Sequence, residues 1–137
     1  MNEFDEVIYH PIGVINSNYT IKEETPKSSK TNEDEAELIV NPVYLEAMSD
    51  IEVGKKYFII FHFHKSEGFK QTVPIYGDGP MTGLFSTHAP SRPNSIGLST
   101  ITVKEVIGNI IKFTGVDMLD GTPVLDIKNY TQWNIQY

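Results

Sequence analysis

The chain has 137 residues, a formal net charge of −7 at pH 7 and no cysteine. These values indicate one globular domain, over residues 1–137, and they exclude disulfides, thiolate catalysis and cysteine-based metal sites. No apolar run reaches the roughly 18 residues that a membrane span needs, and the acidic first residues lack the basic start of a secretory signal. We therefore expect a cytoplasmic protein without a membrane partner, and the acidic balance disfavours non-specific binding to nucleic acid.

The first half of the chain predicts two strands, a long loop and one helix. Residues 7–15 form a first strand with Pro11 at an edge or bulge, because proline has no backbone N–H to donate. Residues 16–36 are polar and exceed an ordinary connection of about 4–6 residues, which is typical of functional or mobile loops. A short strand over 37–40 follows. An asparagine cap with a proline behind it then predicts one short helix over 41–48.

The second half predicts the remaining strands. Residues 56–64 have the strongest strand pattern, and both faces begin apolar, so we expect a central strand. The dipeptide Gly108-Asn109 predicts a tight hairpin turn between strands over 96–107 and 110–116. A final extended run covers residues 123–130. The pattern as a whole predicts an all-β fold: a small antiparallel β-barrel with one short helix and long loops.

Two histidines lie at the C-terminal end of the predicted central strand. At period-two spacing, His62 and His64 point to the same face and could bind a metal ion. No third ligand is recognisable in the sequence, so we expect no metal site and interpret the pair as polar lining at a barrel mouth.

A polar loop over residues 83–97, here called the arginine loop, contains the only arginine of the chain, Arg92. Prolines on both sides restrict its backbone, so Arg92 and Asn94 are presented on a rigid loop that suits a ligand. The alternative is a surface loop whose arginine forms an ion pair of modest energy.

A second unusual segment, here called the aspartate segment, covers residues 117–128. The Asp120-Gly121 pair indicates a turn, and Asp126 lies within a strand pattern in which aspartate is disfavoured. We expect Asp126 to be a buried carboxylate that needs a cationic or amide partner. A turn with an internal ion pair explains these residues as well as catalysis does.

The two segments resemble those of the TsaA-like, or TrmO, family. The arginine loop ends in Ser-Arg-Pro-Asn-Ser-Ile-Gly, and the aspartate segment contains Leu-Asp-Gly-Thr-Pro-Val-Leu-Asp-Ile-Lys. Residues 11–19, 24–26 and 61–63 add to a match in the right order over nearly the whole chain. The resemblance implies a small antiparallel barrel, usually a homodimer, that binds S-adenosylmethionine and methylates N6 of threonylcarbamoyladenosine at tRNA position 37.

The resemblance also implies where the site lies. Arg92 would bind a carboxylate, either that of the methionine moiety or that of the threonylcarbamoyl group. Asp126 or His62 would accept the proton that the adenine nitrogen loses. The residues expected to bind the cofactor are Phe61, Phe85, Ser86, Thr87, His88, Arg92, Pro93, Asn94, Ile96, Gly97, Asp120, Gly121, Thr122, Pro123 and Leu125.

The chain departs from the family pattern at three positions. His88 stands where the family has an arginine, Ser95 where it has a proline, and Asn129 where it has a second proline. We also expect the chain to be a short form without the C-terminal domain of longer bacterial members. One permanent cation is thereby replaced by a titratable side chain, and cofactor binding is better supported than tRNA methylation.

Two alternatives follow from these departures. The chain could be a non-catalytic barrel that binds or senses S-adenosylmethionine, or a methyltransferase acting on a small molecule. A barrel mouth lined by Lys22, Lys27, Lys30 and Lys128 would favour RNA, whereas scattered lysines would favour the other two functions.

Overall fold

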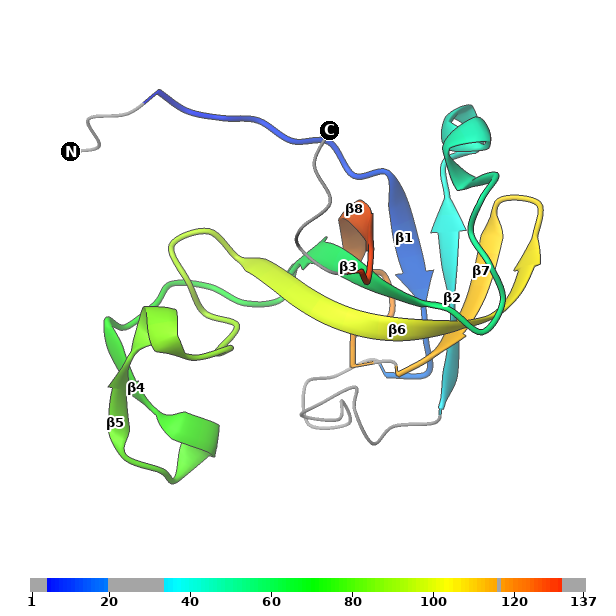
Figure 1. Ribbon diagram of the computed structural model, residues 1–137. Helices are drawn as coiled ribbons and strands as arrows, with labels where there is room; N and C mark the ends of the chain where they lie inside the picture. The colour runs from blue at the N-terminus through cyan, green and yellow to red at the C-terminus, as the bar shows by residue number, and fades with distance from the viewer. Residues whose placement is uncertain (1–4, 20–33, 116, 132–137) are drawn as a thin grey trace.

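Six antiparallel strands form a closed barrel in the order β1–β2–β7–β6–β3–β8 (Figure 1). The structure, a computed structural model, describes residues 5–19, 34–115 and 117–131. The strands of the barrel are β1 Gly13–Asn16, β2 Glu35–Val40, β3 Lys56–His62, β6 Ile96–Ile107, β7 Ile110–Thr114 and β8 Pro123–Asn129. The all-β prediction is confirmed, and β3 lies between β6 and β8 as its two apolar faces indicated.

The core fills the inside of this barrel. Side chains alternate between the two sides of each strand, so every second residue of β2 and of the first part of β6 is buried. The largest side chains with almost no exposed surface are Phe113, Ile15, Leu38, Ile59, Ile101, Ile111 and Met118. A barrel of this size has an interior that side chains can fill completely.

The hairpin between β6 and β7 was predicted correctly. Gly108 adopts a φ of 57°, which a glycine reaches without steric cost. Asn109 then fixes the turn to the end of β2: its side-chain Nδ2 donates to the carbonyl oxygen of Val40 at 2.7 Å, and its own carbonyl accepts from the Val40 N–H at 2.9 Å. β7 ends at Thr114, and Val116 lies outside the described residues.

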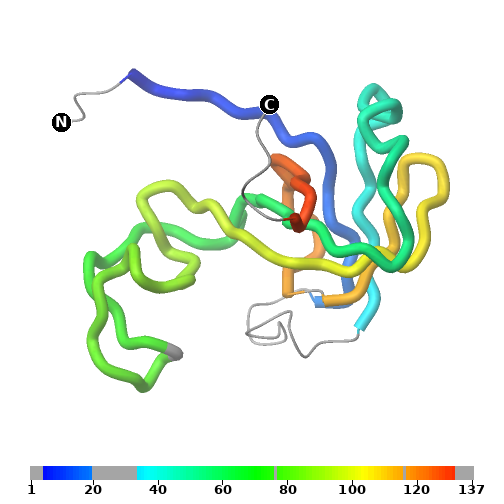
Figure 2. Tube along the Cα trace, viewed as in Figure 1, coloured from blue at the N-terminus to red at the C-terminus, as the bar shows by residue number. Residues whose placement is uncertain are grey.

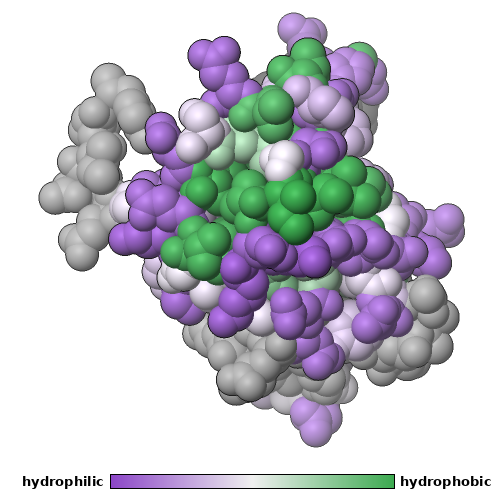
Figure 3. All heavy atoms as spheres, turned by 90° about the vertical axis from the view of Figure 1, so that its right-hand side faces the viewer, coloured by the Kyte–Doolittle hydropathy of each residue, from purple (hydrophilic) through white to green (hydrophobic). Residues whose placement is uncertain are grey.

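The outside of the barrel carries one apolar row. Val14, Ile39, Ile110 and Ile107 face outward, and successive members of this row are cross-strand partners on β1, β2, β7 and β6. The face of β2 and β7 shows a hydrophobic band bordered by hydrophilic side chains (Figure 3). The parallel row of cross-strand partners is polar and consists of Asn16, Glu37, Lys112 and Glu105.

An arm projects from the barrel between β3 and β6 (Figures 1 and 2). Its strands β4 Thr72–Pro74 and β5 Met81–Gly83 pair with each other in a sheet separate from the barrel. The short 3₁₀ helices η4 Ile75–Gly77 and η5 Leu84–Ser86 follow these strands. The sequence patterns predicted none of these elements, and η5 lies inside the arginine loop.

The predicted first strand is wrong over residues 7–12, the first two-thirds of its length. β1 begins only at Gly13, and residues 5–11 extend away from the barrel with exposed side chains (Figure 2). The strand-forming residues before Pro11 have no neighbouring strand, because the contact of this chain end with β8 begins at Ile12, whose N–H donates to Val124.

The predicted single helix over 41–48 is also wrong, although its cap is confirmed. The Asn41 side chain accepts a hydrogen bond from the Val43 N–H at 3.1 Å. Two 3₁₀ helices follow, η2 Pro42–Tyr44 and η3 Glu46–Met48. Their bonds connect residues three apart, which is the tighter geometry common in such short connections. In the described part of the chain, no helix has the length and apolar character needed to cross a membrane.

Candidate functional site

The end of β3 brings the arginine loop and the aspartate segment together. Phe61 is the cross-strand partner of Gly97 on one side and of Val124 on the other. His62 pairs with Ile96, the first residue of β6. Residues from both segments therefore flank a single strand end, as a shared binding site requires.

A close contact between Phe61 and Gly97 fixes this arrangement. A β-carbon added to Gly97 would lie 2.4 Å from Cζ and 2.5 Å from Cε2 of the Phe61 ring. The ring is buried and packs edge-on against Phe63, with the ring centres 4.9 Å apart. Only glycine at position 97 allows the aromatic ring to lie directly against the β6 backbone.

The turn of the aspartate segment is fastened to the chain that follows β1. The Asp120 carboxylate accepts a hydrogen bond from the Ser17 N–H at 3.0 Å, and the Asp120 N–H donates to the Tyr19 carbonyl at 2.6 Å. Gly121, at a φ of 81°, donates to the Ile15 carbonyl at 2.8 Å. Asp120 thus holds two chain segments together, and the sequence did not reveal this pairing with Ser17 and Tyr19.

Thr122, Pro123 and Leu125, which were predicted to bind the cofactor, contact other parts of the barrel. Thr122 is 2% exposed, and its hydroxyl donates to the Leu119 carbonyl at 2.6 Å. Pro123 pairs with Val14 on β1. Leu125, which is half-buried, lies at the register shift between β3 and β8. Thr122 therefore supports the turn from inside and has little surface to offer a ligand.

The two histidines occupy different environments. β3 ends at His62, whose side chain is exposed. Because the strand ends there, the in–out alternation of its side chains does not predict on which side His64 lies. His64 is half-buried, its ring faces the backbone carbonyl of Asp120, and its Nε2 lies 3.8 Å from the position of a β-carbon at Gly121. His64 was not among the predicted site residues, although its spacing from His62 pointed to it.

The pKa of His64 is lowered from its ordinary value of 6.5. Burial has the largest effect, followed by the charges of Lys65 and His62, and these outweigh the hydrogen bond and charge of Asp120, which act in the opposite direction. His64 is therefore a neutral imidazole at neutral pH, with one nitrogen that accepts a proton.

Arg92 holds the arginine loop in shape. Its Nη1 donates to the carbonyl oxygens of Thr87 and Ala89, both at 3.0 Å. Its guanidinium carbon also lies 6.0 Å from the centre of the Phe85 ring, within cation–π range. Within the described part of the chain, no hydrogen bond engages Nη2 or Nε, the edge of the guanidinium that could bind a carboxylate.

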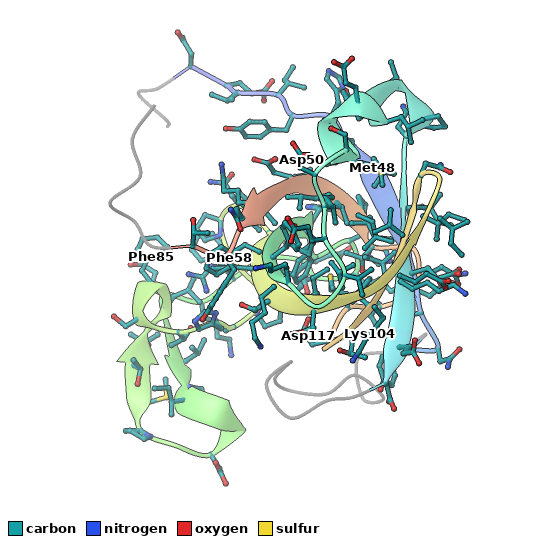
Figure 4. All side chains as sticks on the ribbon, turned by 45° about the vertical axis from the view of Figure 1, so that its right-hand side comes forward. Met48, Asp50, Phe58, Phe85, Lys104 and Asp117 are labelled. Atoms are coloured by element: carbon teal, nitrogen blue, oxygen red, sulfur yellow. The ribbon has the colours of Figure 1, made fainter. Side chains whose placement is uncertain are left out.

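The predicted residues of the arm lie apart from the end of β3. Phe85, Ser86, Thr87 and His88 follow β5 at the end of the arm nearer the barrel (Figures 1 and 4). Phe85 is 81% exposed, a high value for an aromatic side chain. Nearer the barrel, Pro93 and Asn94 are exposed, and the Asn94 carbonyl accepts a hydrogen bond from the Ile96 N–H at 2.7 Å.

The expectation of a buried Asp126 is wrong. Its side chain is 51% exposed, forms an ion pair with Lys128 at 3.3 Å and accepts a hydrogen bond from the N–H of Ile127 at 2.9 Å. Val124 and Ile127 both face the core, because the register shift opposite Ile60 and Phe61 inserts one extra residue. That extra residue turns Asp126 outward. The alternative of an ion pair is correct, but the pair of Asp126 and Lys128 lies on the surface and not in the interior.

A different carboxylate of the same segment, that of Asp117, is half-buried. Asp117 accepts a hydrogen bond from the hydroxyl of Ser99 at 2.5 Å, and Ser99 is 3% exposed (Figure 4 labels Asp117). Burial raises the pKa of Asp117, and the Ser99 hydrogen bond opposes this effect. Sequence reasoning missed Asp117 because the turn residues after it drew attention to Asp120.

Two further predictions concern ligands of other kinds. Among the described residues, no cluster of three or more His, Asp or Glu side chains is placed to hold a metal ion. Lys22, Lys27 and Lys30, three of the four lysines considered for an RNA-binding mouth, lie outside the described residues.

Comparison with known proteins shows which protein family the chain matches. Residues 14–134 match the model of the tRNA-methyltransferase O N-terminal domain. A probable S-adenosyl-L-methionine-binding protein of Pyrococcus abyssi is 38% identical over 90% of the chain and 68% of its own length. The tRNA (adenine(37)-N6)-methyltransferase of Escherichia coli is 35% identical over 89% of the chain and 57% of its own length.

Solved structures agree with the sequence matches. The crystal structure of TrmO from Pseudomonas aeruginosa superposes with a TM-score of 0.78 at 30% identity, covering 96% of this chain and 58% of that one. The chain thus spans little more than half the length of the methyltransferases of Escherichia coli and Pseudomonas aeruginosa that it matches.

Proposed function

Because the chain belongs to the tRNA-methyltransferase O family, we propose that it binds S-adenosylmethionine and transfers the methyl group to N6 of an adenine in tRNA. The expected acceptor is position 37 carrying a threonylcarbamoyl group. The observation that carries this proposal is the junction at the end of β3, where Phe61 has residues of the arginine loop on one side and of the aspartate segment on the other. A tRNA acceptor would place the reaction in the cytoplasm.

Residues of the arginine loop fit a ligand with an aromatic base, a cationic sulfur and a carboxylate. The exposed ring of Phe85 offers a surface for stacking a base or for contact with a cation. Arg92 keeps one guanidinium edge for a carboxylate, and the rigid backbone around Pro93 and Asn94 offers peptide groups.

The bound cofactor would supply an activated methyl group on a sulfonium sulfur. The protein has to align the acceptor nitrogen with that methyl group and exclude water from the line between them, which is chiefly a matter of positioning. Arg92 would orient one carboxylate, and Asp120 would keep the turn beside His64 in place through its bond to Ser17. The proton leaving the adenine nitrogen needs an acceptor, for which the sequence offered Asp126 and His62.

We further propose that the protein acts as a homodimer. Phe85 to His88 lie on an arm whose strands pair only with each other among the described residues, apart from the barrel end that carries the aspartate segment. An arm that reaches a second copy would complete the site across the interface. Light scattering should give twice the mass of the 15.5 kDa chain, and a monomer at tens of micromolar would contradict the dimer.

Methyl transfer from labelled S-adenosylmethionine tests the proposed activity. The acceptor should be tRNA that carries threonylcarbamoyladenosine but lacks N6 methylation, with tRNA that lacks the threonylcarbamoyl group as control. Labelled nucleoside at position 37 is the expected product. Binding of the cofactor in calorimetry without any transfer to this tRNA would favour the non-catalytic alternative, and a flat titration with both S-adenosylmethionine and its demethylated product would exclude the cofactor.

A further inference from the structure

His64 lies where the arginine loop and the aspartate segment meet the end of β3. It follows β3 by two residues, and the preceding Phe63 N–H donates to the Ser95 carbonyl of the arginine loop at 2.8 Å. On its other side the His64 ring lies against the turn of Asp120 and Gly121. The imidazole is therefore anchored from both segments.

The backbone carbonyl of Asp120 beside this ring favours one of its two tautomers. A carbonyl oxygen accepts only, so the nitrogen that bonds it carries the proton, and the other ring nitrogen holds a lone pair. The charged or titratable groups facing His64 are Lys65 and His62 on its own segment and Asp120 on the neighbouring turn. Their combined effect with burial favours the neutral ring, which is the form that a general base needs.

Asp126 and His62, the two proton acceptors that the sequence offered, are less suitable for this role than His64. Asp126 is exposed and already engaged by Lys128 and by the Ile127 N–H. His62 is exposed on the last residue of β3. The His64 ring is half-buried against the turn of Asp120 and Gly121, and such a contact can orient a proton acceptor.

We propose that His64 is the proton acceptor of the methyl transfer, a role that rests on the proposed function. The adenine nitrogen gives its lone pair to the methyl carbon, and the carbon–sulfur bond breaks with its electron pair remaining on sulfur. The proton of that nitrogen passes to the lone pair of the imidazole, which becomes an imidazolium. The Asp120 backbone carbonyl and the nearby carboxylate stabilise the positive charge formed on the ring.

The first test needs no methyl donor. Long-range ¹H–¹⁵N correlation spectra of the free protein report the tautomer and protonation state of each imidazole, and the His64 signals are identified by their loss in His64→Gln. One neutral tautomer at pH 7, with a titration midpoint below 6.5, is expected. A ring that is charged at pH 7, or that exchanges between tautomers, would overturn the proposal.

The second test compares His64→Gln, His62→Gln and His10→Gln, the last lying on the exposed segment before β1. His64→Gln keeps a donor for the Asp120 carbonyl but cannot accept the proton, so kcat on the modified tRNA should fall about 100-fold or more at pH 7. The dissociation constant for S-adenosylmethionine should stay within about twofold. The wild type should lose kcat at low pH, and this loss should persist in the other two variants and vanish in the residual activity of His64→Gln.

The outcomes separate the role of His64 from the proposed function. An active wild type with full kcat in His64→Gln, or with the acid limb lost in His62→Gln instead, would overturn the assignment to His64 alone. A wild type that binds S-adenosylmethionine and methylates no tRNA would overturn the proposed function and the proton transfer with it. A His64→Gln variant that loses cofactor binding as well as kcat would make His64 a binding residue, contrary to the proposal.

Discussion

Replacing Gly97 by alanine tests the contact on which the site depends. The added β-carbon would lie 2.4 Å from the Phe61 ring, more than 1 Å closer than the roughly 3.5 Å of an ordinary carbon contact. The ring is 3% exposed and is held by Phe63, so it has little room to move. Overpacking of this kind costs about 1–3 kcal/mol, from which the entropy gained by replacing glycine recovers about 0.4–1 kcal/mol. From the midpoints of these two ranges, about 2 and about 0.7 kcal/mol, we expect a net loss of about 1.3 kcal/mol.

A double-mutant cycle with Phe61→Leu isolates the contact. Leucine lacks the Cε and Cζ atoms that a β-carbon at Gly97 would strike. Phe61→Leu alone should destabilise the protein by roughly 1–2 kcal/mol, because it leaves a cavity. In its presence, Gly97→Ala should cost close to nothing, so the double variant should be more stable than the sum of the two single changes predicts.

Urea unfolding followed by circular dichroism measures all four free energies of unfolding by linear extrapolation. Gly83→Ala is the matched control, because Gly83 has a φ of −55° and no heavy atom within 4 Å of an added β-carbon. The same variants should rank in the same order for S-adenosylmethionine affinity if the contact shapes the site. A Gly97→Ala protein as stable as the wild type, or an equal cost in the Phe61→Leu background, would refute the reasoning.

Three further substitutions address single groups. Asp117→Asn should raise the free energy of unfolding near pH 7, because burial raises the pKa of Asp117 and its charge therefore destabilises the fold above that pKa. Urea titrations should show that this gain vanishes below the ordinary pKa of 3.8, where Asp117 is protonated in both the folded and the unfolded state. Arg92→Ala should weaken S-adenosylmethionine binding by about 1.5–3 kcal/mol in calorimetry, and an unchanged dissociation constant would leave Arg92 only its bonds to Thr87 and Ala89. His88→Arg should raise the affinity at about pH 8 and flatten its pH dependence, whereas parallel profiles would place His88 away from any anionic group.

The elements that the sequence predicted well are those whose pairing is local. The hairpin of β6 and β7 needs only the turn at Gly108 and two alternating runs, and both its strands begin where they were expected. Residues 7–12 have an equally good strand composition but no partner strand beside them, because Pro11 interrupts the pairing with β8. Strand propensity indicates a suitable segment, and tertiary contacts decide whether it is paired.

In the candidate site, too, the sequence predicted the segments, whereas tertiary structure decided the environment of the individual residues. Its two segments were predicted from composition and resemblance, and the structure places both at β3. The residues within them were harder to rank, because period-two alternation fails wherever a strand ends or bulges. His64 lies two residues beyond the end of β3, so the alternation did not predict its environment. Asp126 was expected to be buried because aspartate is disfavoured in strands, but it directly follows a register shift that turns it outward.

The position of Phe61 has a consequence for how the two segments act together. Gly97 contacts the ring directly, and Val124 is the cross-strand partner of Phe61 on the opposite side. A shift of the arginine loop that moves β6 at Gly97 therefore displaces Phe61, and this displacement reaches β8 and the turn of Asp120 without any direct contact between the segments. Residues coupled through one shared side chain do not contribute independently to stability or binding. Substitutions in the arginine loop and in the aspartate segment should for this reason show non-additive effects on cofactor affinity, and removing the Phe61 ring should make them additive.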